Sequence, residues 1–221
     1  MLLRRLQDLL GGIYDVRVAH DVYDFLVTDR GHLPASARAG VADEVLIIDQ
    51  PREGQSGGDE VGVSLYLDPA LLSRLDDQDP TVRLHTGNVA DYCTALEGVS
   101  HFVYLAWNAG HDKPVSVAEL EMQAEVDKYV ASYWLMRQQL PGRLPAELRR
   151  ILFERSRVDP RLAGTREDLY RHASRYAERF CRSLERQLLR ARGRWELPVL
   201  AELRRFYRLG HARKLAHIER L

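Results

Sequence analysis

The chain has 221 residues, of which 45% are hydrophobic and 29% are charged. This composition is sufficient for a buried core, and it excludes intrinsic disorder as the main state. The 32 basic and 32 acidic side chains balance, so the overall charge favours neither a nucleic-acid partner nor a membrane partner. Only two cysteines are present, which excludes a disulfide framework and a zinc site built from cysteines.

The charge is distributed unevenly along the chain. From Arg143 onward there are 21 basic and 10 acidic side chains, whereas the preceding part has 11 basic and 22 acidic ones. We therefore place a boundary near Pro141-Gly142 and predict two regions, 1–142 and 143–221. The N-terminal residues lack the continuous apolar core of a signal peptide, and no run is long enough to cross a bilayer. We expect a cytoplasmic protein without a membrane partner.

The beginning of the first region mixes predicted helices with predicted strands. A short amphipathic helix is expected to end at Gly11-Gly12, and alternating apolar residues within 13–29 predict two strands. The β-branched and aliphatic runs 44–49 and 61–67 predict a hairpin with a long polar connection. Asp68-Pro69 predicts the start of a short helix, because aspartate caps helices and proline is accepted at the first helical position.

Two long helices are predicted next. Residues 88–107 are apolar in nearly every direction around the helix axis, which is typical of a helix in the interior. Ser116 and Glu119 have the spacing of a capping box, from which a second helix is expected to run to about Leu140. We expect Asp127 on this helix to be solvated. The predicted fold class is therefore α+β: a strand-containing N-terminal part packed on two buried helices, followed by an all-helical C-terminal extension.

The few ionisable residues on these helices are the candidate site, because burying a charge without a partner or a metal is costly. Glu97 and His101 are four residues apart, so they project from one face of the helix and could hold a metal ion between them. On the second helix, one narrow polar sector, flanked by apolar residues, contains Glu121, Glu125, Lys128 and Ser132.

This arrangement resembles the gluzincin metallopeptidases, whose H-E-x-x-H helix is followed at a similar distance by a helix with a glutamate ligand. The resemblance implies that His101 matches the second histidine, Glu121 the downstream glutamate, and Glu125 the acid that orients a histidine. Glu97 stands where the first histidine belongs, and Gly98 where the general-base glutamate belongs. The resemblance covers about 40 residues, and half of its signature motif is missing, so the implied site is degenerate.

We therefore predict a zincin-like, degenerate metal-binding protein with Glu97, His101 and Glu121 as ligands. The ion is Zn²⁺ or another divalent metal such as Mn²⁺ or Fe²⁺, because carboxylate-rich ligand sets are less selective for zinc. If the protein is a metal-dependent hydrolase, the base must come from elsewhere. Glu125, and His111 in the loop between the helices, are the candidates for this catalytic role.

An alternative interpretation needs no metal. Glu97 and His101 are also compatible with a hydrogen-bonded pair within one helix, and Glu125 is compatible with an ion pair to Lys128, three residues further on. These contacts would form a buried polar network with a purely structural role.

The basic region 143–221 is the second functional lead. It predicts further helices, with breaks at Asp159-Pro160, Gly164, Gly193 and Pro198. Aromatic residues such as Tyr170 are interleaved with arginines, a composition that can contact phosphates and stack on bases. We favour docking of the basic region on the acidic one, within the chain or between subunits, over nucleic acid. The alternative function is a non-enzymatic scaffold or interaction protein whose basic helices bind an acidic protein or nucleic acid.

Overall fold

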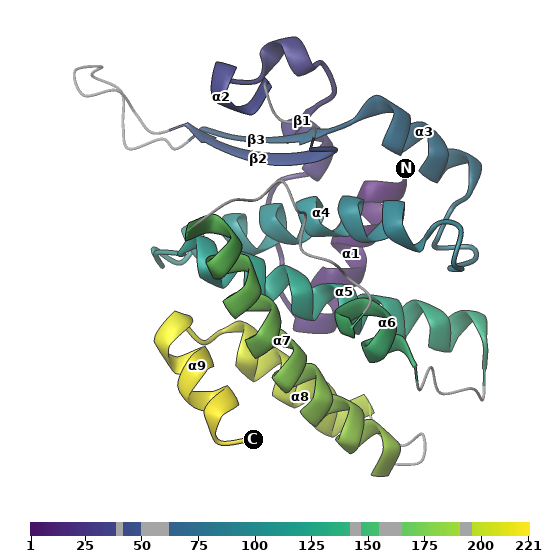
Figure 1. The fold of residues 1–221 in the computed structure, drawn as a ribbon, viewed down its shortest axis with the longest axis vertical. Helices are drawn as coiled ribbons and strands as arrows, with labels where there is room; N and C mark the ends of the chain where they lie inside the picture. Colours follow the sequence, from purple (N-terminus) through teal and green to yellow (C-terminus); the bar gives the residue numbers. More distant parts are fainter. Residues whose placement is uncertain (39–41, 50–61, 142–146, 155–164, 191–195) are drawn as a thin grey trace.

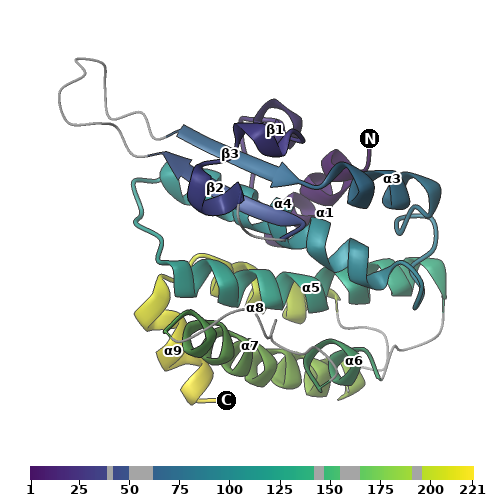
Figure 2. The ribbon, with the colours of Figure 1, turned by 45° about the horizontal axis from the view of Figure 1, so that its top comes forward.

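The computed structural model of the protein describes residues 1–38, 42–49, 62–141, 147–154, 165–190 and 196–221. Most of these residues lie in helices, and the strands are confined to one small sheet (Figure 1). The fold is layered (Figure 2). The sheet packs on α4 (Val89–Ala109), α4 packs on α5 (Val117–Gln139), and α5 packs on α7 (Thr165–Arg190). The two long central helices are thus confirmed to within about two residues at each end.

The sheet has the order β1-β3-β2 among the described residues. The strands are β1 (Leu26–Val27), β2 (Glu44–Asp49) and β3 (Gly62–Leu67). Strand β3 is parallel to β1 and antiparallel to β2, and the register places Glu44 opposite Leu67. The predicted hairpin is therefore confirmed, while its connection lies outside the described residues.

Two predictions for the N-terminal part were wrong. Helix α1 (Leu2–Tyr14) continues through Gly11-Gly12 and ends at Asp15, which adopts the left-handed conformation with φ 54°. Its apolar face is buried in the core, and this tertiary packing outweighs the low helix propensity of two glycines. The first predicted strand within 13–29 is not a strand, and the second is reduced to η1 (Val22–Phe25) followed by β1. The side chain of Asp21 caps η1 and so favours a turn.

Short elements flank the sheet. After β1 come η2 (Arg30–His32) and α2 (Ala35–Arg38), and after β3 comes α3 (Pro69–Asp77). The side chain of Asp68 accepts a hydrogen bond from the backbone N–H two residues on, at 2.8 Å, and Pro69 occupies the first turn of α3. The predicted start of this helix is therefore confirmed.

Helix α4 occupies the centre of the fold. It packs against β2 and β3 on one side and against α5 on the other, while α1 and α3 cover its flanks. This environment explains why α4 is apolar in nearly every direction. Helix α5 is covered by α4 and α7, so ionisable side chains between these helices have little access to water.

The C-terminal part is helical, as predicted. Its helices are α6 (Leu148–Glu154), α7, α8 (Glu196–Tyr207) and α9 (His211–Glu219). The predicted break at Pro198 was wrong, because this proline lies in the first turn of α8, where its missing N–H costs no intrahelical hydrogen bond. The other predicted breaks in this region lie outside the described residues.

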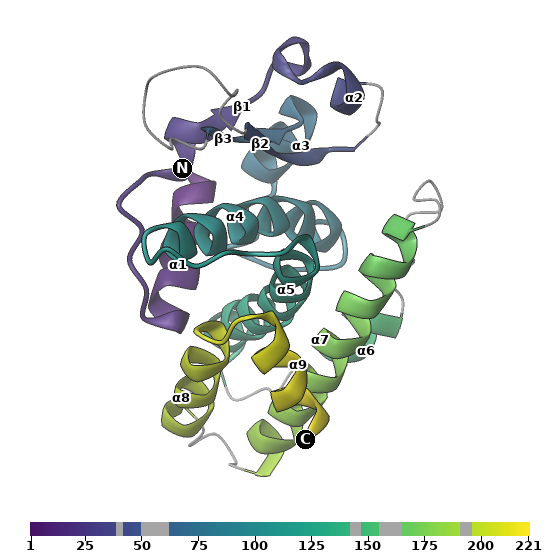
Figure 3. The same cartoon turned by 90° about the vertical axis from the view of Figure 1, so that its left-hand side faces the viewer.

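Helix α8 packs against α1 (Figure 3). Arg204 donates a hydrogen bond to the carbonyl of Ile13, and Arg208 donates to the carbonyls of Tyr14 and Asp15 at 3.1 and 3.0 Å. These carbonyls lie at the C-terminal end of α1, where they lack partners within the helix and where cations are favourable. Basic side chains of the second region thus dock on the first region within the chain.

The two predicted regions contribute to one hydrophobic core cluster, which extends from α1 to α9. The division at residue 142 stays a prediction. No helix in the described part of the chain combines the length and the apolar character needed to cross a membrane.

Candidate metal centre

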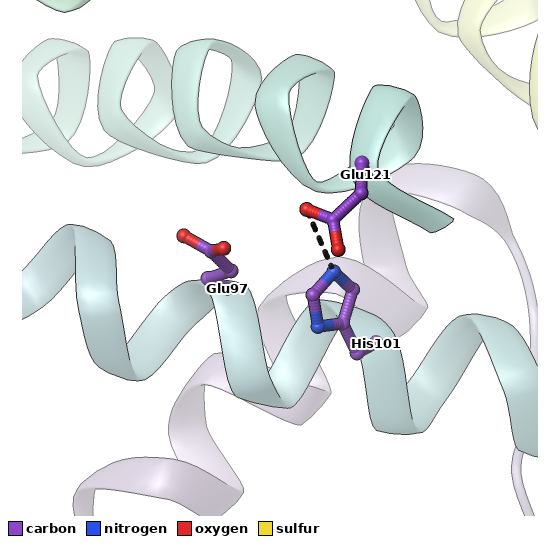
Figure 4. Close-up of side chains that lie close together, drawn as sticks. All are labelled: Glu97, His101 and Glu121. Carbon is purple, nitrogen blue, oxygen red and sulfur yellow. Dashed lines mark ion pairs between the residues drawn. The ribbon is translucent and has the colours of Figure 1, made fainter. Parts of the chain in front are cut away.

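The structure brings the three predicted metal ligands together between α4 and α5. Glu97 and His101 project from α4 toward α5, and Glu121 projects from the beginning of α5 toward them (Figure 4). One ligand atom from each residue lies within 4.8 Å of the other two. The spacing of four residues on α4 places its two side chains one turn apart, and the packing of α5 on α4 supplies the third.

The imidazole of His101 is the central group of this cluster. His101 is 5% exposed, and its Nε2 is buried with no hydrogen-bond partner among the described residues. The nearest carboxylate oxygen, Oε2 of Glu121, is 3.8 Å from Nε2. This distance is too long for a hydrogen bond, whereas two ligands at about 2.1 Å from one tetrahedral ion lie about 3.4 Å apart. The distance between these two atoms is therefore compatible with an ion between them.

Glu44 of β2 lies on the opposite side of the same imidazole. Its Oε1 is 3.5 Å from Nδ1 of His101 and is also buried without a hydrogen-bond partner in the described structure. Glu44 is not predictable as part of this site, because a glutamate at the end of a strand gives no signal of a site until the sheet is placed on α4.

Gly98 allows this close approach of the sheet to α4. A Cβ atom at this position would lie 2.7 Å from Cδ1 of Leu65 and 3.0 Å from Cγ of Glu44. Position 98 is where the gluzincin motif carries its general-base glutamate, so this position has no space for such a side chain.

We expect Gly98→Ala to lower the free energy of unfolding by about 1–3 kcal/mol, because buried Leu65 must move to make room for the added methyl group. Urea denaturation measures the change. Gly12→Ala is the matched control: it also places alanine in a helix, but its Cβ would have no atom within 4 Å, so a gain of up to about 1 kcal/mol is expected. Equal effects of the two substitutions would contradict the close packing at Gly98.

The remaining acid of the predicted sector, Glu125, is paired with Lys128. The ammonium group of Lys128 lies 2.7 Å from Oε1 of Glu125 and 2.5 Å from Oε2 of Glu97. The predicted ion pair between Glu125 and Lys128 is thus confirmed. The structure places Glu44, and not Glu125, beside the imidazole of His101.

The second candidate for a catalytic base is not brought to the cluster. His111 follows the end of α4, ten residues after His101 and therefore about 15 Å away along the helix direction. Its Nδ1 lies 2.7 Å from the carbonyl oxygen of Trp107, and its ring packs against the indole of the same residue.

Acidic groups outnumber basic ones in this cluster. Even with a protonated imidazole, four carboxylates face two cations among the described residues, so this part of the cluster carries an excess of negative charge in a largely buried place. Uncompensated buried charge is costly, and protons or a metal ion can offset it. The acidic residues are Glu44, Glu97, Glu121 and Glu125, and the basic ones are His101 and Lys128.

The pKa values of the cluster follow from this charge excess. Burial lowers the pKa of His101, but Glu44, Glu121 and Glu97 outweigh it and raise the pKa to about 9. Burial raises the pKa of Glu121 to about 7, with Glu97 and Glu44 adding to the effect and His101 opposing it. Burial also acts to raise the pKa of Glu97, but the ammonium of Lys128 and then His101 outweigh it, so that pKa is lowered.

Tyr170 of α7 brings the C-terminal region to the cluster. Its hydroxyl interacts with Glu121, and burial together with that carboxylate raises the pKa of Tyr170 above the usual value. The hydroxyl therefore stays protonated and available as a donor. From sequence alone, Tyr170 is only one of the aromatic residues of the basic region.

A second buried cluster surrounds Asp127, and the prediction that this residue is solvated was wrong. Asp127 is 1% exposed and accepts hydrogen bonds from the hydroxyl of Tyr14, from Oγ of Ser100 at 2.6 Å and from Nε2 of Gln123 at 2.8 Å. The ammonium of Lys214 from α9 donates to Oε1 of Gln123 at 2.5 Å. Asp127 is buried because α1, α4 and α9 all contribute side chains at this level of α5.

Glu119 lies near the same buried cluster as Asp127, because both carboxylates act on the ammonium group of Lys214. Oγ of Ser116 accepts a hydrogen bond from the backbone N–H of Glu119, as the capping box predicts, but the Glu119 carboxylate accepts one from the hydroxyl of Tyr104 at 2.5 Å. The ammonium of Lys214 lies 4.4 Å from the centroid of the Tyr104 ring. Burial lowers the pKa of Lys214 to about 7, and Glu119 and Asp127 oppose this effect.

Comparisons of the chain with protein-family models, with curated proteins and with solved structures give no match. The chemistry of the Glu97, His101 and Glu121 cluster is therefore inferred from its own atoms. It offers one imidazole nitrogen and two carboxylates to a single ion. Three protein ligands of this kind leave a coordination position for water or another small ligand.

Proposed function

We propose that the protein binds one divalent metal ion through Glu97, His101 and Glu121, and thus functions as a zincin-like, degenerate metal-binding protein. The observation that carries the proposal is the buried Nε2 atom of His101, which has no hydrogen-bond partner in the described structure and faces a carboxylate oxygen at 3.8 Å. A buried polar atom without a partner is costly, and coordination to an ion between the two groups would satisfy it.

The charges of the cluster support the same proposal. A divalent ion would supply two positive charges where the carboxylates exceed the cations. Lys128 contacts Oε2 of Glu97, which leaves Oε1 of that carboxylate for the ion. A set of one imidazole and two carboxylates suits Zn²⁺, Mn²⁺ and Fe²⁺, and zinc binds most tightly of the three at a given site of this type.

Hydrolysis would be the enzymatic form of this function, and the surroundings favour metal binding without it. Position 98 has no space for a carboxylate base, the carboxylate of Glu125 is paired with Lys128, and His111 is far along the helix direction. A water bound to the ion would need a nearby acceptor for its proton, which none of these three positions supplies.

The alternative of an interaction protein with basic helices stays a prediction. Several arginines of these helices already have partners within the chain. Arg149 contacts Glu178 and Glu185 at 2.6 and 2.9 Å, and Arg182 contacts Glu178 at 2.7 Å. Side chains engaged in this way contribute less to a salt-dependent surface for an acidic partner.

Metal content tests the proposal directly. After separate incubation with Zn²⁺, Mn²⁺ and Fe²⁺ and removal of free metal, we expect the tag-free protein to retain about one equivalent of at least one ion. His101→Ala and Glu121→Ala should each lower the retained metal at least tenfold, measured by elemental analysis at a defined protein concentration.

His32→Ala is the control, because its side chain is 75% exposed and lies outside the cluster, and it should retain as much metal as the parent protein. Circular dichroism establishes that each variant is folded. A parent protein that takes up none of the three ions, or folded cluster variants that bind as it does, would overturn the proposal.

A further inference from the structure

We propose that Glu44 is the positioning residue of the metal centre: its carboxylate holds the Nδ1–H of His101, so that Nε2 faces the ion. This inference rests on the proposed metal-binding function. It gives to a strand residue the role that the gluzincin resemblance implies for Glu125, and it makes the small sheet part of the site.

The geometry around the imidazole supports this assignment. Oε1 of Glu44 lies 3.5 Å from Nδ1, and Oε2 of Glu121 lies 3.8 Å from Nε2. Each ring nitrogen therefore has a different carboxylate beside it. Oε1 of Glu44 has no hydrogen-bond partner in the described part of the chain, so this oxygen is available to accept the Nδ1–H. A metal-binding histidine commonly donates its second ring N–H to such a carboxylate, which fixes the ring orientation.

The local packing is arranged so that this carboxylate can reach α4. Glu44 lies opposite Leu67 at the end of the paired segment of β2 and β3. On the facing side of α4, the absence of a side chain at Gly98 leaves room for both Leu65 and the Cγ of Glu44. The Glu44 side chain is 13% exposed, so its interaction with the imidazole is weakly screened by water.

The chemistry of the ring gives this contact a consequence for metal binding. A neutral imidazole has one N–H and one nitrogen with a free lone pair. An acceptor at Nδ1 favours the tautomer with the proton there, which leaves the lone pair of Nε2 toward Glu97 and Glu121. Without Glu44, the ring can rotate or place its proton on Nε2, and both changes remove the ligand from the ion.

Substitutions can separate positioning from charge. Glu44→Gln keeps an oxygen acceptor at the same place but removes the charge, whereas Glu44→Ala removes both. We expect the dissociation constant for Zn²⁺, measured by competition with a chromophoric chelator, to rise less than about threefold in Glu44→Gln and about 10–100-fold in Glu44→Ala. Glu125→Gln removes a charge from the same cluster without touching the imidazole, and it should resemble Glu44→Gln.

Nuclear magnetic resonance of the zinc-loaded protein labelled with ¹⁵N in histidine provides a readout that a purely structural role would not change. The His101 signals, assigned by their absence in His101→Ala, should show the proton on Nδ1 in the parent protein and in Glu44→Gln. In Glu44→Ala at saturating zinc, the Nδ1–H should exchange with water much faster, because its acceptor is gone.

The outcomes distinguish this inference from the proposed function. A parent protein that binds no metal refutes the function itself. A parent protein that binds zinc, together with a folded Glu44→Ala variant of equal affinity, refutes the role of Glu44 alone. Equal weakening by Glu44→Gln, Glu44→Ala and Glu125→Gln would assign the effect to charge and would also refute positioning.

Discussion

Replacing Asp127 by alanine is expected to lower the free energy of unfolding by about 3–5 kcal/mol, the largest effect of any single substitution considered for this chain. The carboxylate accepts hydrogen bonds from Tyr14 of α1, from Ser100 of α4 and from Gln123 of α5, all in the interior. Its removal leaves these donors without an acceptor and takes a negative charge from the surroundings of Lys214.

Urea denaturation at neutral pH measures the effect. Asp127→Asn is the matched control, since an amide oxygen at the position of Oδ1 can still accept from Tyr14 and Gln123, and it should cost clearly less than alanine. Asp77→Ala, at the exposed end of α3, should change the stability little. A loss below about 1 kcal/mol in Asp127→Ala would show that the surrounding donors find other partners.

The error about Asp127 shows what a helical wheel cannot provide. The sequence pattern predicts a polar sector on α5, but Asp127 lies outside this sector, and the same pattern predicts that Asp127 faces solvent. Its position is covered by Tyr14 of the first helix and Lys214 of the last described one, which are 113 and 87 residues away in the chain. Only the tertiary arrangement shows that these segments meet there.

A signal for both clusters was nevertheless present in the composition. The chain contains three lysines, Lys113, Lys128 and Lys214, among 32 basic residues, so arginine is used almost everywhere else. Two of these three lie in the clusters between the helices, each in contact with polar groups of α5. A compact ammonium group is more easily enclosed among several acceptors than a planar guanidinium group.

The predicted ligands came together because their placement depends mainly on local geometry. Glu97 and His101 share a face of one helix, and Glu121 needs only the packing of the next helix against it. Glu44 and Tyr170 were missed as members of the site because β2 and α7 are brought to it by the layered arrangement, which no local pattern encodes.

The two buried clusters differ in a way that strengthens the argument for an ion. Around Asp127, three donors are directed at one carboxylate, and Lys214 completes the network through Gln123. Around His101, by contrast, buried atoms of an imidazole and a carboxylate lack partners in the described structure, and acidic groups are in excess. The first cluster is complete with protein groups alone, whereas the second has places for a cation.

Lys214→Met is expected to remove a pH-dependent part of the stability. Burial lowers the pKa of Lys214 to about 7 in the folded protein, against the effects of Glu119 and Asp127, whereas the pKa of an unfolded lysine is about 10.4. Between these values the unfolded chain binds more protons than the folded one. The contribution of Lys214 to the free energy of unfolding therefore rises with pH in this window, by up to about 1.4 kcal/mol per pH unit, and it is constant below it.

The difference in unfolding free energy between the parent protein and Lys214→Met, measured by denaturation with a chelator present, isolates this contribution. His101 acts in the opposite direction: its pKa is raised to about 9, so its contribution falls as pH rises, but it is common to both proteins and cancels. The groups that face the ammonium are Gln123, Glu119 and Asp127 of α5, Tyr104 of α4, and Phe206 and Tyr207 of α8.

We expect the difference in unfolding free energy between the two proteins to be flat from pH 6 to 7 and then to increase up to pH 9 in favour of the parent protein. A difference that stays flat to pH 9 would mean that the ammonium keeps its charge inside the fold, stabilised by the aromatic faces and the amide oxygen around it.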